Sequence, residues 1–300
     1  MSLTTRLFLS VILIVSTSLT YAGIKMTTYN IRTFDLKNSY TNKVELKKII
    51  TKLNSDFITV QEIVNHKSFA KFIIRNFKGY KLHLSKCGGG GRQKIGFLYR
   101  SDKFILEQAY EDKRLSDTGQ IVGEYGCGRL RPALVGVFKE RKTKKRFVVI
   151  GIHLKAGGTP ASYETRKTQY KVVSRIIEEL RLADLNNILL MGDFNSTGYV
   201  HFDTDYVNFT NMLTQSGMRT SSKNLKCTAY WAGHDREDNR EEPSVLDHII
   251  YPTKFLSYKR SRATLGSHCK AVSCHVVSAE SLGVSYKEVS DHCPVSTTFY

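Results

Sequence analysis

The sequence NILLMGDFNS at residues 187–196 joins an apolar run to a group of polar side chains. Residues 187–191 are short, aliphatic and bounded by polar residues, which is typical of a buried β-strand. Asp193 and Asn195 follow the run almost directly, so this strand would point a carboxylate and an amide out of the end of a sheet. A Gly-Asp pair after a strand is usually only a turn, so its meaning depends on whether other strands end similarly.

Several other apolar segments have polar side chains at one end. These residues are Asn30 closing residues 24–30, Glu62 after 56–61, His153 after 147–152, Asp247 between 244–246 and 249–251, and Asp291 with His292 before 294–299. An apolar strand that ends in a polar group points that group out of the sheet, so we expect these ends to converge on one cleft. Each residue alone would be an ordinary polar side chain in contact with solvent, and the prediction depends on the joint pattern.

The carboxylates and amides of this set suit a hard metal ion. Mg²⁺ prefers oxygen ligands, usually one or two carboxylates together with water and substrate phosphate. Glu62, Asp193 and Asp291 supply carboxylates, whereas Asn30 and Asn195 supply neutral oxygens. The pattern therefore predicts a divalent-metal site.

The histidines of this set suit acid/base chemistry. Cleavage of a phosphodiester needs a base to activate water and an acid or a metal for the leaving oxygen. His153 and His292 have suitable intrinsic pKa values, and Asp247 could fix the tautomer of one imidazole, as in catalytic triads. His248, by contrast, is expected to be structural.

Apolar spacing predicts helices at residues 42–53, 67–77 and 162–182. The predicted strands are residues 24–30, 56–60, 80–85, 95–100, 131–138, 146–153, 187–191, 228–231, 244–251 and 294–299. This order mixes hairpins with strand–helix units. It indicates an α+β fold in which two mixed sheets pack face to face, with helices outside.

The first 22 residues have the features of a secretory signal peptide. A short polar stretch with one positive charge precedes the apolar run 7–15, and small residues follow up to Ala22. The run is shorter than the roughly 20 residues of a membrane-spanning helix, although an uncleaved anchor is the alternative. Cleavage after Ala22 would leave a single domain at residues 23–300, outside the cytoplasm.

The net charge of +18, from 45 Lys+Arg against 27 Asp+Glu, favours a polyanionic partner. Nucleic acid, anionic lipid and acidic polysaccharide are all attracted by such a charge, which does not choose among them.

The even number of cysteines suggests disulfides in an exported protein. They are Cys87, Cys127, Cys227, Cys269, Cys274 and Cys293. Spacing does not fix the pairing, but Cys269 and Cys274 enclose a short loop and could pair, and Cys293 could equally be a buried free thiol.

Taken together, the motifs resemble the endonuclease/exonuclease/phosphatase superfamily, and within it the deoxyribonuclease I branch. The motifs, in the family's order, are TYNIRTF at 28–34, VQEI at 60–63, GIHLKAG at 151–157, LMGDFNS at 190–196, LDHIIYP at 246–252 and SDHCPV at 290–295. MGDFN and SDHxP together are highly specific. The resemblance implies a four-layer α/β/β/α sandwich with the active site at one end.

The resemblance also implies roles for the polar residues. The metal site would consist of Glu62, Asn30 and Asp291. The acid/base pair would be His153 and His292, with Asp247 orienting His292. Asp193 and Asn195 would hold the scissile phosphate and orient the attacking water, and the further phosphate contacts would be Arg131, Asn195 and Lys155.

The sequence departs from the family pattern at several positions. Gln93 stands where a glutamate normally partners the first catalytic histidine, and Val64 replaces an arginine expected near the metal glutamate. The glycine run 88–91 replaces the loop that carries a minor-groove tyrosine. The disulfide beside GDFN is absent, because its positions match Gly198 and Ser244.

The leading hypothesis is a secreted, Mg²⁺-dependent endonuclease that cuts DNA with low sequence specificity, with Mn²⁺ as an alternative and Ca²⁺ in a structural role. RNA stays open as a substrate. We expect a monomer without stable membrane association. One alternative is a phospholipid or sphingomyelin phosphodiesterase, disfavoured because no apolar membrane-inserting hairpin is found. Another is a catalytically inactive binding module, disfavoured because both histidines and the carboxylates are retained.

Overall fold

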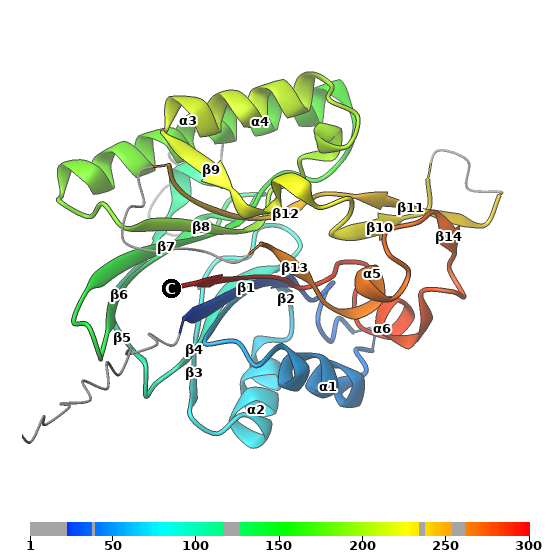
Figure 1. The fold of residues 1–300 in the computed structure, drawn as a ribbon, viewed down its shortest axis with the longest axis horizontal. Coiled ribbons are helices and arrows are strands. Elements are labelled where there is room, and N and C mark those ends of the chain that lie inside the picture. The colour runs from blue at the N-terminus through cyan, green and yellow to red at the C-terminus, as the bar shows by residue number, and fades with distance from the viewer. Residues whose placement is uncertain (1–22, 38–39, 117–126, 234–237, 254–261) are drawn as a thin grey trace, which may run out of the picture.

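The computed structural model describes residues 23–37, 40–116, 127–233, 238–253 and 262–300. Two six-stranded sheets pack face to face, and helices cover their outer faces (Figure 1). The predicted α+β four-layer sandwich is therefore confirmed. The predicted signal peptide at residues 1–22 lies outside the described residues.

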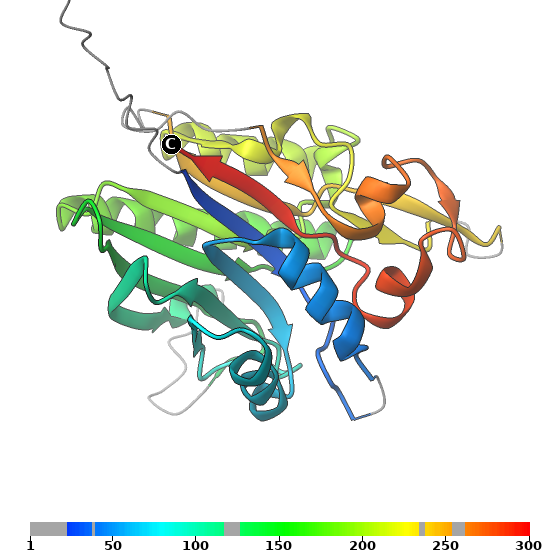
Figure 2. The ribbon, with the colours of Figure 1, turned by 60° about the horizontal axis from the view of Figure 1, so that its bottom comes forward.

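The first sheet has the strand order β13-β15-β1-β2-β4-β3. Its strands are β1 (Ile24–Asn30), β2 (Phe57–Ile63), β3 (Tyr80–Leu84), β4 (Lys94–Arg100), β13 (Thr264–Leu265) and β15 (Val295–Phe299). β1 runs parallel to β2 and antiparallel to β15, and Figure 2 shows β1 and β15 side by side. Helices α1 (Lys43–Leu53) and α2 (His66–Asn76) cover its outer face, because their apolar stripes pack on it.

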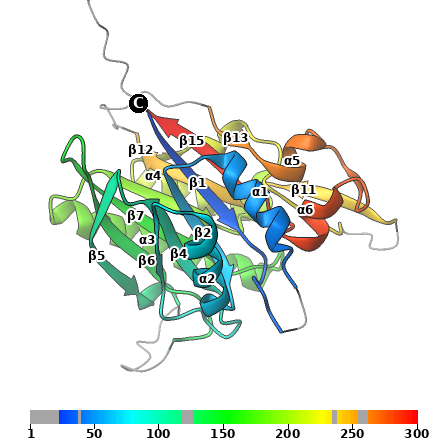
Figure 3. The same ribbon diagram turned by 90° about the horizontal axis from the view of Figure 1, so that it is seen from below.

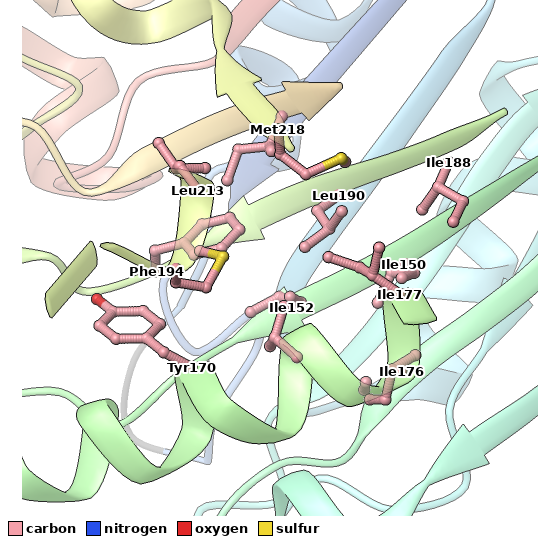
Figure 4. Close-up of a cluster of buried hydrophobic side chains, with 14 of the residues drawn as sticks. Ile150, Ile152, Tyr170, Ile176, Ile177, Ile188, Leu190, Phe194, Leu213 and Met218 are labelled. Carbon is pink, nitrogen blue, oxygen red and sulfur yellow. The ribbon is translucent and has the colours of Figure 1, made fainter. Parts of the chain in front are cut away.

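The second sheet has the order β5-β6-β7-β8-β12-β9. Its strands are β5 (Phe104–Asp112), β6 (Ala133–Glu140), β7 (Arg146–His153), β8 (Ile188–Asp193), β9 (Met218–Thr220) and β12 (Asp247–Pro252). β7 and β8 are parallel, and β12 is antiparallel to β8. Helices α3 (Pro160–Leu182) and α4 (Thr204–Gln215) cover this sheet, and their buried side chains interlock with those of β7 and β8 (Figure 4).

The space between the two sheets is filled largely by aromatic and aliphatic side chains. The Phe57 ring of the first sheet meets the Phe138 ring of the second edge-on, with centroids 4.9 Å apart. Central strands are buried on both faces, which explains why their sequences are continuous apolar runs rather than alternating ones.

A third, small sheet lies beside the sandwich. It consists of β10 (Ala229–Trp231), β11 (Arg240–Ser244) and β14 (Val277–Ser278), with α5 (Ser267–Ala271) and α6 (Gly283–Glu288) next to it. The strand predicted at residues 244–251 is wrong in part, because β11 ends at Ser244 and β12 begins at Asp247. This break places Asp247 at the start of a strand.

Three disulfides join Cys87 to Cys127, Cys227 to Cys274, and Cys269 to Cys293. The suggested pairing of Cys269 with Cys274 is therefore wrong, and so is the alternative of a free Cys293. The backbone N–H of Cys269 lies 3.0 Å from the Cys293 sulfur, so α5 faces the start of β15. Three disulfides are typical of proteins from oxidising compartments. Within the described part of the chain, no helix combines the length and apolar character needed to cross a bilayer.

Candidate active site

The strand directions bring the predicted polar residues to one end of the sandwich. Parallel β7 and β8 place His153 opposite Asp193, and antiparallel β12 places Asp247 opposite Asp193 on its other side. In the first sheet, parallel β1 and β2 place Asn30 opposite the residue before Glu62. The topology thus brings these strand ends together, as expected from the sequence.

Glu62 is turned into this cluster by a distortion of β2. The register between β2 and β4 shifts between Val60 and Ile63, and Glu62 has a φ of 63°. Bulges of this kind re-aim side chains and often lie beside active sites. The Glu62 carboxylate accepts hydrogen bonds from the Thr33 backbone N–H at 2.8 Å and from the Asn30 amide at 3.1 Å. Strained backbone at a polar residue that is this well held is typical of a functional position.

Asn30 connects the two sheets through its amide. Its Nδ2 donates to Glu62 Oε1 and, at 3.0 Å, to Asp193 Oδ2. Its Oδ1 accepts from the Arg32 backbone N–H at 3.1 Å. The hydroxyl of Ser290 donates to the Asn30 carbonyl at 2.8 Å and accepts from the His292 N–H at 3.1 Å. Ser290 therefore couples the position of Asn30 to that of His292, a role that the sequence analysis missed.

Gly192 allows β7 and β8 to meet at this end. A Cβ at Gly192 would lie 1.9 Å from the Ile152 carbonyl oxygen, and its φ of +155° is unfavourable for other residues. The glycine of the MGD sequence is thus required by the close approach of the strand that carries His153 to the strand that carries Asp193.

The two histidines approach Asp193 from different elements. Nε2 of His153 lies 3.6 Å and Nε2 of His292 lies 3.7 Å from the same oxygen, Asp193 Oδ2. His153 Nε2 also lies 3.7 Å from Glu62 Oε1. Both imidazoles therefore face the space around the Asp193 and Glu62 carboxylates.

The surroundings push the pKa values of the two histidines apart. Burial lowers the pKa of His153 well below its ordinary value, and nearby Arg131 and His292 lower it further. Burial acts in the same direction on His292, but Asp247 and Asp193 outweigh it and hold the pKa of His292 well above its ordinary value. Such opposed shifts are a common sign of an acid and a base in one site.

The Nδ1 atoms of the two imidazoles have different hydrogen-bonding surroundings. Nδ1 of His292 lies 2.8 Å from Asp247 Oδ2, and this contact holds the ring in place. Nδ1 of His153 is buried and has no hydrogen-bond partner among the described residues. Gln93, which stands where the family carries a partnering glutamate, is only half-buried, and no hydrogen bond connects it to His153 in the described structure.

The predicted phosphate contacts divide into two groups. Arg131 is buried beside the site, where its Nε donates to the His153 carbonyl at 3.1 Å and Nη2 donates to the Leu154 carbonyl. Asn195, with a φ of 49°, donates to the same Leu154 carbonyl at 3.2 Å. Lys155 instead turns its Nζ to the Ala156 carbonyl at 2.6 Å, so the structure does not bring it to the carboxylates.

Arg166 and Asp205 form a buried ion pair beside the loop that follows His153, and the sequence predicted neither residue. Both side chains have no exposed surface, and Arg166 Nη2 lies 2.8 Å from Asp205 Oδ2. The guanidinium also donates to the Lys155 and Gly157 carbonyls at 2.7 and 2.9 Å. The pair thus fixes the loop that follows His153. No sequence signal marks it, because isolated charges on helices are usually solvated.

Asp291, the third predicted metal ligand, lies next to His292 but is held less tightly. The Ser290 hydroxyl lies 3.5 Å from its carboxylate, and burial, together with the Asp291 charge, raises the pKa of Glu62. Among the described residues, the donors that come within 4.8 Å of one another at this end are Asp193, Asp247 and His292.

The donor set fits a divalent cation. Four carboxylates gather here, those of Glu62, Asp193, Asp247 and Asp291, and one oxygen of Asp247 is buried without a partner in the described structure. Burial raises the pKa of both Glu62 and Asp193, which means that the surrounding positive groups do not fully compensate their charges. Carboxylate and amide oxygens are the ligands that hard cations prefer. Bound metal would relieve this excess of negative charge.

The chain matches one known protein family over most of its length. The sequence model of the Endonuclease/Exonuclease/phosphatase family matches residues 27–292. The chain belongs to this family. Its members are metal-dependent phosphoesterases, and the deoxyribonuclease I-like branch is consistent with the observed fold.

Solved structures of the endonuclease/exonuclease/phosphatase family share this fold. An endonuclease/exonuclease/phosphatase from Bacteroides vulgatus is 17% identical and has a TM-score of 0.66, with 93% of this chain and 99% of that chain covered. D. rerio TDP2 complexed with single strand DNA product is 13% identical, with a TM-score of 0.65 and coverage of 93% and 100%.

A mannosyl-6-phosphatase from Bacteroides thetaiotaomicron has the same fold at 17% identity, with a TM-score of 0.60 and coverage of 92% and 99%. No curated protein sequence matches the chain. At these identities the solved structures support the fold only. The substrate has to be inferred from the chemistry of the site.

Proposed function

We propose that this protein is a secreted, metal-dependent endonuclease that hydrolyses phosphodiester bonds of DNA, with RNA as a further substrate. The observation that carries the proposal is the meeting of two imidazoles at one carboxylate oxygen. Nε2 of His153 and Nε2 of His292 lie 3.6 and 3.7 Å from Asp193 Oδ2. A phosphate held beside Asp193 would have one imidazole on the side of the attacking water and another near the leaving oxygen.

The metal would be Mg²⁺, with Mn²⁺ as a substitute and any Ca²⁺ in a structural role. Glu62, Asn30 and Asp291 would hold it, because they supply two carboxylates and an amide oxygen, the ligands that hard cations prefer. When bound, the ion would polarise the scissile phosphate and stabilise negative charge in the transition state.

The acid/base work falls to the two histidines. Nδ1 of His292 is committed to Asp247, so Nε2 is the atom that exchanges a proton with substrate. A neutral His153 would accept a proton from the attacking water, and a charged His292 would give one to the leaving oxygen. The opposed pKa shifts of the two rings support this division. Asp193 and Asn195 would orient the water and the phosphate, and the buried Arg131 would add positive charge beside them.

Charge and disulfides support the substrate and the location. A net charge of +18 attracts nucleic acid through its phosphates, which position a protein without reading base sequence. Three disulfides favour an exported protein. Residues 1–22 would be removed on export, and residues 23–300 would act as a monomeric catalytic domain.

The test is plasmid cleavage by the oxidised protein. Supercoiled DNA would be incubated with Mg²⁺, with and without chelator, and conversion to nicked circles would be measured. The variant His153→Ala His292→Ala should lose this activity. The matched control, His201→Ala His275→Ala, removes two exposed histidines elsewhere and should retain it.

Intact plasmid in the presence of Mg²⁺, Mn²⁺ and Ca²⁺ would overturn the DNA proposal. Phospholipid vesicles and small phosphomonoesters would then be the substrates to test, because both belong to phosphoester chemistry that the same residues could perform.

A further inference from the structure

A basic groove lies on the outer helical layer, away from the histidines. It runs between α1 and α2, which lie on the same side of the first sheet (Figure 3), and has a volume of about 490 Å³. Its walls carry Lys43 and Lys47 from α1, and Lys71 and Arg75 from α2, above the buried Phe72 ring. A volume of this size is in the range of ligand-binding clefts.

The positive charge of this groove is largely uncompensated. None of the described residues that line it is acidic, and of its cations Lys43 is paired, with its Nζ 2.6 Å from Asp35 Oδ2. Among the described residues, no ion pair or side-chain hydrogen bond reaches the Nζ atoms of Lys47 and Lys71 or the Arg75 guanidinium. Three like charges that share one groove repel each other, so an anion in the groove would be stabilised.

The arrangement of the cations indicates an extended anion. Lys71 and Arg75 are four residues apart, so they lie on the same face of α2 and about 6 Å apart along its axis. Lys47 lies on the opposite wall, on α1. A row of charges along a groove complements a chain of phosphates better than it complements a single phosphate ion.

The groove begins at the loop that holds Glu62. The Phe34 N–H donates to the Glu62 carbonyl at 2.9 Å, and the neighbouring Asp35 accepts from the Ser68 hydroxyl at 2.6 Å. Ser68 lies in the first turn of α2 and lines the groove. Contacts are therefore continuous from the metal side of the active site to the near end of the groove.

We propose that the α1–α2 groove is a second nucleic-acid site, which binds backbone phosphates of a strand whose scissile bond lies at His153 and His292. This inference rests on the proposed nuclease function and extends it. The groove adds affinity for long substrates and leaves the chemical step unchanged, since none of its cations reaches the catalytic residues.

A matched pair of variants tests the groove. Lys47→Ala Lys71→Ala Arg75→Ala removes its three unpaired cations. Lys167→Ala Lys171→Ala Arg175→Ala removes two lysines and one arginine from α3, on the opposite outer layer, so the change in net charge is the same. Both sets are exposed, so both variants should keep the wild-type unfolding midpoint. If the triple groove variant does not fold, single substitutions to Gln replace it.

Binding would be measured without metal, by fluorescence anisotropy of a labelled DNA duplex long enough to reach both sites, over a range of salt concentrations. Each lost phosphate contact reduces the magnitude of the negative slope of log K against log salt by about 0.9. The magnitude of the slope should therefore be about 2 to 3 smaller for the groove variant than for wild type. The α3 variant should keep nearly the wild-type slope. Hydrolysis of a short phosphodiester that cannot reach the groove should be equal in all three proteins.

Equal losses in both variants would overturn the proposal, because net charge alone would then explain them. Groove-dependent binding of phosphatidylglycerol vesicles, with DNA binding unaffected, would also overturn it in favour of a lipid surface. If DNA binding depends on the groove but the protein cleaves no DNA, the proposed nuclease function is overturned and the groove proposal is supported. If the protein cleaves DNA but binding does not depend on the groove, only the groove proposal is overturned.

Discussion

Nδ1 of His292 lies 2.8 Å from Oδ2 of Asp247, and this contact joins the two sheets of the sandwich at their polar end. His292 lies three residues before Val295, where β15 of the first sheet begins, whereas Asp247 opens β12 of the second sheet. The side chains are 9% and 0% exposed, so water does not compete for the bond. The contact therefore fixes both the tautomer of the imidazole and its position relative to Asp193.

The substitution Asp247→Asn should lower the rate of DNA cleavage by about 10²- to 10⁴-fold, because an amide does not stabilise the charged imidazole and can favour the wrong tautomer. Initial rates of plasmid nicking measure this. Asp184→Asn, at an exposed position, is the control. An unchanged rate in a folded Asp247→Asn protein would show that this carboxylate does not serve catalysis.

Removing one partner of the buried Arg166–Asp205 pair should cost about 3 to 5 kcal/mol of unfolding free energy, because the remaining charge is left buried. Asp205→Asn in a urea titration measures the effect. The double variant Arg166→Met Asp205→Leu should be less destabilised than the single one, since no charge stays behind. A double variant as unstable as the sum of its singles would contradict this explanation.

Loss of the Cys269–Cys293 disulfide should reduce both stability and catalysis. The pair is fully buried and closes a sequence separation of 24 residues, so Cys269→Ser Cys293→Ser should cost about 3 kcal/mol. Cys293 follows His292 directly, and a shift of that segment should lower kcat about tenfold or more.

The control for this prediction is Cys87→Ser Cys127→Ser, which removes a disulfide between two other loops. It should lower the unfolding midpoint but retain kcat at temperatures where the variant is folded. Equal losses of kcat in both variants would mean that reduced stability alone explains the effect.

The position of the site could be predicted because strand ends are local features. Asn30, Glu62, His153 and Asp193 each follow an apolar run, and parallel strands bring such ends together. The resemblance to a family added the four-layer arrangement, which propensities alone leave open. Strand β5 was missed because it is an edge strand in which only Phe104 is buried and a register shift between Leu106 and Gln108 interrupts the alternation of its side chains.

Other features depend on contacts between distant segments, which spacing does not encode. Cys269 and Cys274 are close in sequence, yet α5 turns Cys269 towards Cys293, while Cys274 reaches Cys227. Lys155 follows His153 closely in sequence, but its Nζ donates to the Ala156 carbonyl instead of facing the carboxylates. The direction of a loop side chain depends on which polar groups lie near it in the folded chain, and the sequence alone does not show these neighbours.

His248 makes the last prediction, on acid stability. Its ring is fully buried among Phe194, Tyr199 and Phe209, and hydrogen bonds join its nitrogens to the hydroxyls of Ser196 and Thr220 at 3.0 and 3.1 Å. Burial lowers the pKa of His248 to about 3. The expectation that this histidine is structural agrees with these contacts.

Below the ordinary histidine pKa of about 6.5, His248 is protonated in the unfolded chain but stays neutral in the folded protein. The unfolding free energy contributed by His248 is therefore fully present above about pH 6.5 and falls as the pH decreases towards 3. At pH 5 the loss relative to pH 8 should be about 2 kcal/mol. Urea titrations at both pH values measure it. His248→Gln should be less stable at pH 8 but lose about 2 kcal/mol less on acidification, whereas His201→Gln should behave as wild type. If His248→Gln and wild type lose the same stability between pH 8 and pH 5, the buried neutral imidazole is not the source of the acid sensitivity.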